Sequence, residues 1–163
     1  MTISPDAEDE GLARPEGAVD LGLLPGLIGY ALRRAQVAVF QDFQRHFAAE
    51  DIRPAQFSVL VVLQRNPGLR ATRVAAALGI QRTNFVPLLD RLVLRGLAER
   101  RRVKGDRRAS ALFLTEAGAG MLARLERLVA AHDQKFAARL GMEGRYQIIG
   151  LLHRLTEEAV DPA

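Results

Sequence analysis

The sequence predicts a mainly α-helical fold with one β-hairpin, and three observations support this prediction. Apolar side chains recur at helical spacing through most of the 163-residue chain. Alternation with period two is confined to residues 97–114, around Lys104, Gly105 and Asp106. Glycine and proline separate the helical segments. The order of short helix, glycine turn, second helix and hairpin is that of a winged helix-turn-helix with a two-stranded β wing, and the long helices outside it are expected to form a dimerisation region.

The first long helix is expected to run from Pro25 to about residue 50, since proline is tolerated in the first turn of a helix. This helix is too long for one small domain to bury, so part of its apolar stripe is expected to contact a partner. Residues 1–20, acidic and interrupted by proline and glycine, are expected to form a disordered tail. The apolar stripe comprises Leu27, Ala31, Ala35, Val39, Phe43 and Phe47.

Three further helices are expected between residues 54 and 95. Pro54 opens the first of them, and Asn66-Pro67-Gly68 ends it. A short helix over residues 70–78 is followed by Gly79, which supplies the break of a tight turn, and by a helix over residues 81–95. The side chains expected to point into the core are Phe57, Leu60, Val61, Leu63, Phe85, Leu88, Leu89 and Leu92.

The hairpin strands are expected over residues 97–103 and 109–114. Thr115 can cap a long helix that extends to about residue 139, where Leu140-Gly141 breaks it. A last helix over residues 142–159 is expected to bury Tyr146, Ile149, Leu152 and Leu155. We therefore expect a tail over residues 1–20, a dimerisation region over residues 21–53 and 115–160, and a winged helix-turn-helix lobe over residues 54–114.

Composition excludes several classes of protein. With 48% hydrophobic and 26% charged residues the chain is ordinary for a globular protein. The absence of cysteine excludes a disulfide framework, a thiolate nucleophile and a cysteine-ligated zinc site. No apolar run approaches the roughly 18 to 20 residues that span a bilayer. The acidic start lacks the features of a secretory signal, so the expected location is the cytoplasm.

The positive charge is concentrated in one part of the chain. The net charge is +4, but residues 1–20 carry six acidic side chains and one arginine. Residues 70–108 carry eleven basic and three acidic side chains, and this stretch accounts for nearly all of the excess positive charge of the chain beyond residue 20. A charged stretch is often only a solvated face. Its concentration here favours a polyanionic partner, since each phosphate contact releases counterions.

Two elements of this basic stretch suit DNA. The helix that follows Gly79 begins with four hydrogen-bonding side chains, those of Gln81, Arg82, Thr83 and Asn84, and such a helix end can reach base edges in the major groove. An arginine on a thin β-ribbon can enter a narrow minor groove. Asp106 is close enough in sequence to hold Arg108 in place by a bidentate bond. The alternative is a surface hairpin with an incidental ion pair.

Several motifs together resemble the MarR family of bacterial regulators, with the likeness extending over about residues 24–160. They are Leu88-Leu89-Asp90-Arg91-Leu92, Arg95-Gly96-Leu97-Ala98-Glu99-Arg100, Asp106-Arg107-Arg108 and Leu114-Thr115-Glu116-Ala117-Gly118. The resemblance implies a homodimer with two winged lobes, in which Asp106 orients Arg108 toward the minor groove. The residues expected to bind DNA are Arg70, Arg73, Gln81, Arg82, Thr83, Asn84, Arg91, Lys104, Asp106, Arg107 and Arg108.

The resemblance also implies an effector pocket between the dimerisation helices and the lobes. The sequence of the first long helix is similar to members that sense aromatic acids or their coenzyme A thioesters. An aromatic stripe at helical spacing is more often core, which is the alternative for its phenylalanines. The candidate ligand-binding residues are Arg33, Arg34, Gln36, Phe40, Phe43, His46 and Phe47.

The expected function is a homodimeric repressor that an aromatic acid or its thioester releases from a palindromic operator by changing the distance or angle between the lobes. Pro87 departs from the family pattern, since it removes a helical hydrogen bond, and we hypothesise that it re-aims the recognition helix. The three scattered histidines offer no catalytic set, so no enzyme, catalytic residue or cofactor is expected. No metal site is expected, although His132 and His153 leave a metal-responsive regulator as an alternative. The other alternative function is that of a non-specific architectural DNA-binding protein.

Overall fold

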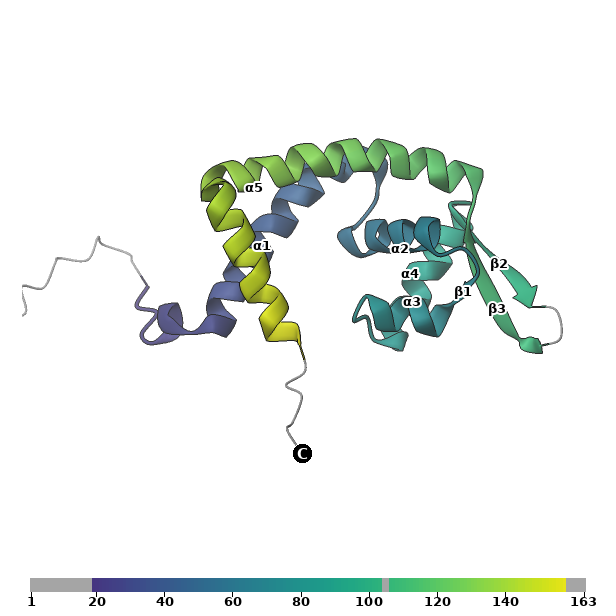
Figure 1. Cartoon of the computed structure of the whole chain (residues 1–163), viewed down its shortest axis with the longest axis horizontal. Coiled ribbons are helices and arrows are strands. Elements are labelled where there is room, and N and C mark those ends of the chain that lie inside the picture. The colour runs from purple at the N-terminus through teal and green to yellow at the C-terminus, as the bar shows by residue number, and fades with distance from the viewer. Residues whose placement is uncertain (1–18, 104–105, 158–163) are drawn as a thin grey trace, which may run out of the picture. The chain divides into compact units, whose positions relative to one another are not determined.

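The structure, a computed structural model, describes residues 19–103 and 106–157, without the side chains of residues 103 and 106–109. Its elements confirm the expected mainly helical fold with a β wing (Figure 1). The chain divides into two units, Met1–Val37 and Ala38–Ala163. In chain order the elements are η1 (Leu24–Gly26), α1 (Ile28–Phe47), η2 (Ala48–Glu50), α2 (Pro54–Arg65), β1 (Leu69–Arg70), α3 (Ala71–Ala77), α4 (Arg82–Leu94), β2 (Ala98–Val103), β3 (Asp106–Leu114) and α5 (Glu116–Thr156).

The described part of the first unit consists of η1 and the beginning of α1. Pro25 opens the short 3-10 helix rather than the long helix, because Leu27 is extended and separates the two. The long helix therefore begins at Ile28, three residues later than expected. Large apolar side chains of this unit are exposed, namely Val19, Leu21, Leu23, Leu24, Leu27, Ile28 and Leu32.

The core of the second unit is built from the end of α1, from α2, α3 and α4, from the sheet and from the first half of α5. Leu60, Leu63, Phe85, Leu89 and Leu92 are buried as expected. Phe57, Val61 and Leu88 are only partly buried and pack against this core from its edge. Burial of a side chain of this size contributes about 1.5–3 kcal/mol, so the lobe that carries α4 is held mainly by this cluster.

The wing is a three-stranded antiparallel sheet with the order β1-β3-β2. In β2 and β3, Ala98 pairs with Leu114 and Arg102 with Ser110, before a register shift toward the tip. The two-residue strand β1 pairs with Leu112 and Ala111 of β3 and was not expected, since it is too short to show a period-two pattern.

The wing and α4 meet the start of α5 at a tightly packed junction. Thr115 Oγ1 donates to Gly96 O at 2.6 Å and accepts from Gly118 N at 2.9 Å, which confirms the expected helix cap. The backbone N–H of Thr115 donates to Leu97 O at 3.2 Å. A Cβ atom on Gly118 would overlap the carbonyl oxygen of Leu97 and lie 2.8 Å from Leu114 Cδ1. Only glycine at this position allows the helix to approach so closely.

The end of α5 differs from the expectation in one respect. Gly141 has the non-helical angles φ 70° and ψ 167°, so the expected break is present. Beyond it, Tyr146 is 60%, Leu152 37% and Leu155 56% exposed, and Ile149 is half-buried. The prediction that these side chains are buried is wrong for a single chain. An apolar stripe predicts contact with some surface, but helical periodicity does not distinguish the chain's own core from a second molecule.

A buried carboxylate joins α1 to α5. Asp42 is 2% exposed, and its Oδ1 accepts from Lys135 Nζ at 2.5 Å and from Arg45 Nη2 at 3.1 Å. His46 Nδ1 lies 3.3 Å and His132 Nε2 3.7 Å from its other oxygen. The Lys135 ammonium, which donates a hydrogen bond, holds the pKa of Asp42 below its ordinary value against the opposing effect of burial. The pair stabilises the contact between the two helices only while Asp42 is ionised.

The junction at Gly118 gives a first prediction. We expect Gly118→Ala to lower the free energy of unfolding by about 1–3 kcal/mol or more, because the added methyl group must displace the Leu97 carbonyl. Gly120→Ala is the matched control, since nothing lies within 4 Å of a Cβ atom there. Denaturant unfolding measures both. Equal stability of the two variants would show that the junction tolerates a side chain.

The pair between Asp42 and Lys135 gives a second prediction. We expect Lys135→Met to lower the free energy of unfolding by about 1–3 kcal/mol at neutral pH, since it leaves a buried carboxylate without its main donor. Because the pKa of Asp42 is lowered in the folded state, its contribution is present above the ordinary aspartate range and is lost as pH falls through the folded pKa. The difference between wild type and variant should therefore shrink in acid. Arg145→Met removes an exposed pair with Asp133 and should cost about 0–1 kcal/mol at any pH; an equal, pH-independent loss in both variants would contradict the account.

Candidate DNA-binding surface and effector cavities

The turn between α3 and α4 positions the recognition helix. Gly79 takes φ +62°, a left-handed conformation that favours glycine, and Ile80 N donates to Ala75 O across the turn. The N-cap of α4 is Gln81, whose side chain makes no capping hydrogen bond. Phe85, Leu89 and Leu92 fix one face of the helix in the core. The opposite face of the first turn is exposed, and it carries the four predicted residues Gln81, Arg82, Thr83 and Asn84.

The recognition helix runs without interruption from Arg82 to Leu94, although Pro87 lies inside it. Pro87 is exposed, and it lines a cavity together with Asn84 and Arg91. The hypothesis that Pro87 alters the choice of DNA site stays a prediction.

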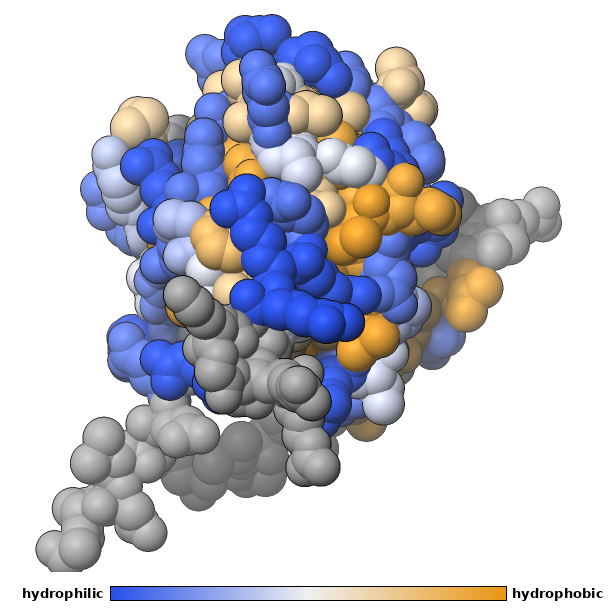
Figure 2. Space-filling view, turned by 90° about the vertical axis from the view of Figure 1, so that its right-hand side faces the viewer, coloured by the Kyte–Doolittle hydropathy of each residue, from blue (hydrophilic) through white to orange (hydrophobic). Residues whose placement is uncertain are grey.

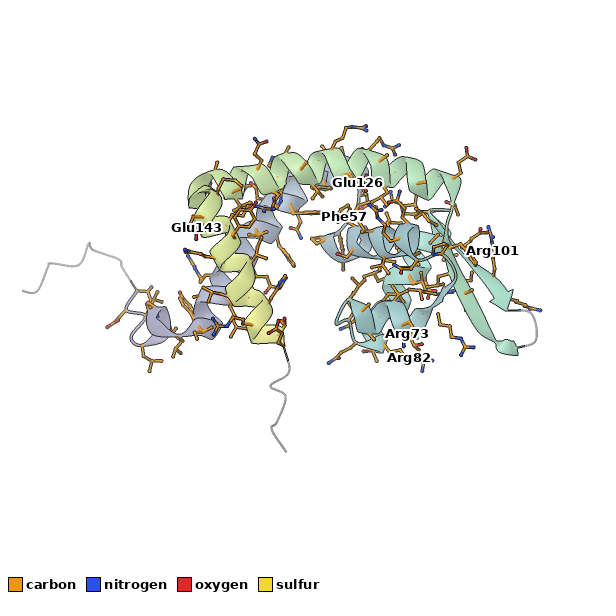
Figure 3. All side chains as sticks on the ribbon, viewed as in Figure 1. Phe57, Arg73, Arg82, Arg101, Glu126 and Glu143 are labelled. Carbon is orange, nitrogen blue, oxygen red and sulfur yellow. The ribbon has the colours of Figure 1, made fainter. Side chains whose placement is uncertain are left out.

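Basic side chains border α4 on the side of the lobe that faces away from α5. Figure 3 shows Arg73 of α3 and Arg82 of α4 projecting from this side, and both are exposed. Arg70 lies on β1 and is also exposed. These residues give the lobe a cationic surface around the recognition helix.

Two of the three arginines of β2 have contacts that partly neutralise them. Arg100 Nη2 donates to Asp90 Oδ1 at 2.5 Å. Arg101 pairs with Glu99, and its guanidinium lies 4.3 Å from the ring centroid of Phe113. The face on the wing side is largely hydrophilic, with separate hydrophobic patches (Figure 2).

The tip of the wing lies outside what the structure describes in full. Lys104 is not among the described residues, nor are the side chains of Asp106, Arg107 and Arg108. Their roles in DNA binding, including the orientation of Arg108 by Asp106, therefore stay predictions.

Two cavities adjoin α2 in the second unit, and the second of them is also lined by residues of the recognition helix. The first has a volume of about 470 Å³ and is lined mainly by apolar groups: Phe40, Gln44, Arg53, Pro54, Ala55, Ser58, Leu78 and Ile80. The second has a volume of about 340 Å³, and its lining includes two arginines and two amide side chains: Arg53, Ala55, Gln56, Asn84, Pro87, Leu88 and Arg91. Arg53 and Ala55 line both, so the two cavities are neighbours.

Only one of the predicted ligand-binding residues lines the first cavity, and that residue is Phe40. Phe43 and Phe47 are buried in the core, where their rings stack with centroids 3.7 Å apart. His46 contacts Asp42. Arg33, Arg34 and Gln36 are exposed residues of the first unit.

Several cavity residues were not predicted, and Arg53, Gln44 and Ser58 are the polar ones of the first cavity. Arg53 could have been suspected from its place just before the helix-opening Pro54, where a cation is unusual at the positive end of a helix. Gln44 and Ser58 carry no signal in the sequence, because only the packing of α1 beside α2 brings them together.

Two further results bear on the alternatives. Among the described residues, no group of three or more His, Cys, Asp and Glu side chains is arranged to hold a metal ion. His132 is buried and faces Val39 O, whereas His153 is exposed near the end of α5. In the same part of the chain, no helix is long and apolar enough to cross a bilayer.

Known proteins share both this fold and much of the sequence. The family model described as MarR family matches residues 50–109. One relative is a protein of Thauera aromatica that is named as a proposed transcriptional regulatory protein for the hcr operon. It is 38% identical over 135 residues, which are 82% of this chain and 81% of the relative. The chain belongs to the MarR family. The resemblance seen in the sequence is confirmed.

Solved structures of the family place the fold in a functional context. The repressor CouR bound to a 23-mer DNA duplex is 43% identical, with a TM-score of 0.81, over 86% of this chain and 99% of CouR. CouR bound to p-coumaroyl-CoA is 41% identical, with a TM-score of 0.81, over 87% and 100% of the two chains. PcaV of Streptomyces coelicolor, in complex with its natural ligand, is 29% identical, with a TM-score of 0.75, over 86% and 96%.

Family membership confirms the general function expected from the sequence. The chain is a DNA-binding transcription regulator of the ligand-responsive, dimeric kind, with a winged helix-turn-helix as its DNA-binding element. Its relatives are regulators rather than enzymes.

Proposed function

We propose that the chain is a cytoplasmic, non-enzymatic repressor that binds a palindromic DNA site as a homodimer and is released by an aromatic acid or its coenzyme A thioester. The observation that supports this effector class is an apolar cavity lined by Phe40, which lies next to a second cavity lined by Arg53 and Arg91. CouR, at 41% identity, has been solved with p-coumaroyl-CoA, an aromatic thioester.

The size and lining of the first cavity suit an aromatic acyl group. Its volume of about 470 Å³ falls within the roughly 300–1,000 Å³ of small-molecule pockets. Phe40 offers a ring for offset stacking, while Leu78 and Ile80 offer aliphatic contacts. Gln44 and Ser58 provide hydrogen-bonding groups for a ring substituent or a carbonyl oxygen.

The DNA contacts divide into two kinds in this proposal. Arg70, Arg73 and Lys104 contact phosphates and position the lobe. The exposed start of α4 contacts base edges in the major groove through Gln81, Arg82, Thr83 and Asn84. Arg91, further along the same helix, also faces the major groove. At the wing, Arg107 and Arg108, with Asp106, serve the minor groove.

The same proposal assigns the parts of the chain. Residues 1–20 form a tail, residues 54–114 the DNA-binding lobe, and residues 21–53 with 115–160 the dimerisation region. The assignment of a dimerisation region is supported by apolar side chains that are exposed to solvent. They lie in η1, at the start of α1 and in α5 beyond Gly141.

Two other functions have less support. A metal-responsive regulator needs a cluster of ligands, and the described residues contain none that could hold a metal. A non-specific architectural protein needs only charge, whereas the start of α4 exposes uncharged hydrogen-bonding side chains beside Arg82.

The division of DNA contacts gives a third prediction. Arg73→Ala should weaken binding to selected and random DNA alike and reduce the slope of log K against log salt by about 1. Asn84→Ala should instead reduce discrimination between the two DNAs, by about 1–3 kcal/mol. Fluorescence anisotropy at several salt concentrations, on a fragment that the protein itself selects from a random library, measures both. Arg127→Ala, an exposed change on α5, is the control; indistinguishable behaviour of all three variants would refute the assignment.

The effector class gives a fourth prediction. Aromatic acids or their coenzyme A thioesters should raise the melting temperature and release the selected DNA, whereas acetyl-CoA should do neither because it lacks a group that fills the first cavity. Phe40→Ala should weaken binding of the aromatic compounds at least tenfold. Val86→Ala, an exposed apolar change on α4 outside both cavities, is the control for binding of the compound. Failure of every aromatic compound in thermal-shift and DNA-release assays would refute the proposed effector.

A further inference from the structure

The recognition helix carries a single carboxylate. Asp90 is the one acidic residue of α4, and it is exposed. It follows Thr83 by seven residues, which is close to two helical turns, so the two side chains lie on the same side of the helix, about 10 Å apart along its axis. Phe85 and Leu89 lie on the buried side. Without a partner, the Asp90 carboxylate would repel phosphates beside the groove that α4 is proposed to enter.

The wing supplies the partner of this carboxylate. Arg100 Nη2 of β2 donates to Asp90 Oδ1 at 2.5 Å, and the two side chains are 38% and 52% exposed. Arg100 reaches the helix because side chains alternate between the two faces of a strand. Ala98, two residues earlier in β2, is 2% exposed and belongs to the core, so Arg100 lies on the same face of the sheet. The pair therefore joins the recognition helix to the root of the wing, residues 98–101 of β2.

A second ion pair lies on the opposite face of β2. Arg101 pairs with Glu99, and its guanidinium lies 4.3 Å from the ring centroid of Phe113. Two of the three acidic residues in the basic stretch 70–108 are thus paired with arginines at the root of the wing. The basic residues beyond them, beginning with Arg102, follow toward the tip. The root of the wing therefore carries little net charge.

The pairing of Arg100 affects two kinds of DNA differently. A phosphate contact strengthens binding to every sequence, because phosphates carry no sequence information. Discrimination is the difference between two affinities, so keeping an arginine away from phosphates improves it by lowering the affinity for random DNA. A selected site also requires the helix and the wing to contact two grooves at once, which a tie between them favours. Random DNA requires charge alone.

We propose that Asp90 is a specificity-determining residue, which acts on DNA through Arg100. It holds this arginine in an ion pair between α4 and β2, keeps it from the phosphates of random DNA and fixes the root of the wing beside the recognition helix. The inference rests on the proposed placement of α4 in the major groove and goes beyond it, since neither residue is among the proposed DNA contacts. Removing the Asp90 carboxylate should therefore strengthen binding and reduce selectivity, whereas loss of a DNA contact weakens binding.

The experiment measures fluorescence anisotropy of the full chain on the selected DNA fragment and on random DNA at several salt concentrations. Asp90→Asn frees Arg100, so the slope of log K against log salt should become steeper by about 1 on random DNA, with about tenfold tighter binding at 0.1 M salt. The selected fragment should gain less because the tie is lost, and we expect discrimination to fall at least about threefold. Asp90→Glu keeps the carboxylate and should retain the slope and the discrimination of wild type.

Two further variants separate pairing from a phosphate contact of Arg100. Arg100→Met exposes the Asp90 carboxylate and should weaken binding to both DNAs. The double variant Asp90→Asn/Arg100→Met removes a neutral pair, so its slope should equal that of wild type. Glu126→Gln, which removes an exposed carboxylate of α5, is the matched control for Asp90→Asn and should change neither slope nor discrimination. Melting temperatures should stay within about 4 °C of wild type, because an exposed ion pair contributes little to stability.

The outcomes separate this inference from the proposed function. If Asp90→Asn leaves the slope unchanged while both variants without Arg100 lose about 1 from it, Arg100 already contacts a phosphate and the inference is overturned. Equal weakening of both DNAs by Asp90→Asn would overturn it too. Asn84→Ala is measured on the same DNAs. If Asn84→Ala lowers discrimination and Asp90→Asn does not, the placement of α4 stands and this inference alone fails. If Asn84→Ala keeps full discrimination, the placement of α4 fails, and this inference fails with it.

Discussion

The close approach of Gly118 to the Leu97 carbonyl is the contact on which the rest of the DNA-binding lobe depends. At this point the end of α4, the first wing strand and the start of α5 come within hydrogen-bond distance, through Thr115 and the backbone of Gly96 and Leu97. A side chain at position 118 would separate the three elements. Because α4 and the wing are both fixed to α5 here, the recognition helix and the β-ribbon are held in a defined relation to each other, which is what simultaneous contact with two DNA grooves requires.

The recognition helix has two exposed surfaces besides its buried face. Its first turn presents hydrogen-bonding side chains to solvent, and the side formed by Asn84, Pro87, Leu88 and Arg91 is a wall of the second cavity. A regulator needs its DNA site and its effector site to affect each other. In this chain the residues proposed to contact bases and one wall of the second cavity belong to the same helix.

The sequence was sufficient to predict most of the helices, the turn at Gly79 and the cap at Thr115, because periodicity, glycine and capping residues are local signals. It could not predict β1, which exists only by pairing with Leu112 and Ala111. The apolar stripe beyond Gly141 was correctly identified as apolar but wrongly placed in the core, since periodicity does not say which molecule covers a face. Phe43 and Phe47 lie stacked in the core, which is the alternative that the sequence left open for them. Arg53 became a candidate only when the fold brought α1, α2 and α4 around two cavities.

The central claim is that two copies of this chain place their α4 helices in the major groove of a specific DNA site. Methylation interference on a fragment that the protein has selected tests this claim most directly, since methylation of guanine N7 blocks contacts in that groove alone. The account predicts two clusters of interfering guanines, related by a two-fold axis and centred about 34 Å, or a whole number of helical turns, apart. Interference that is absent, or that forms a single unpaired cluster, would contradict it.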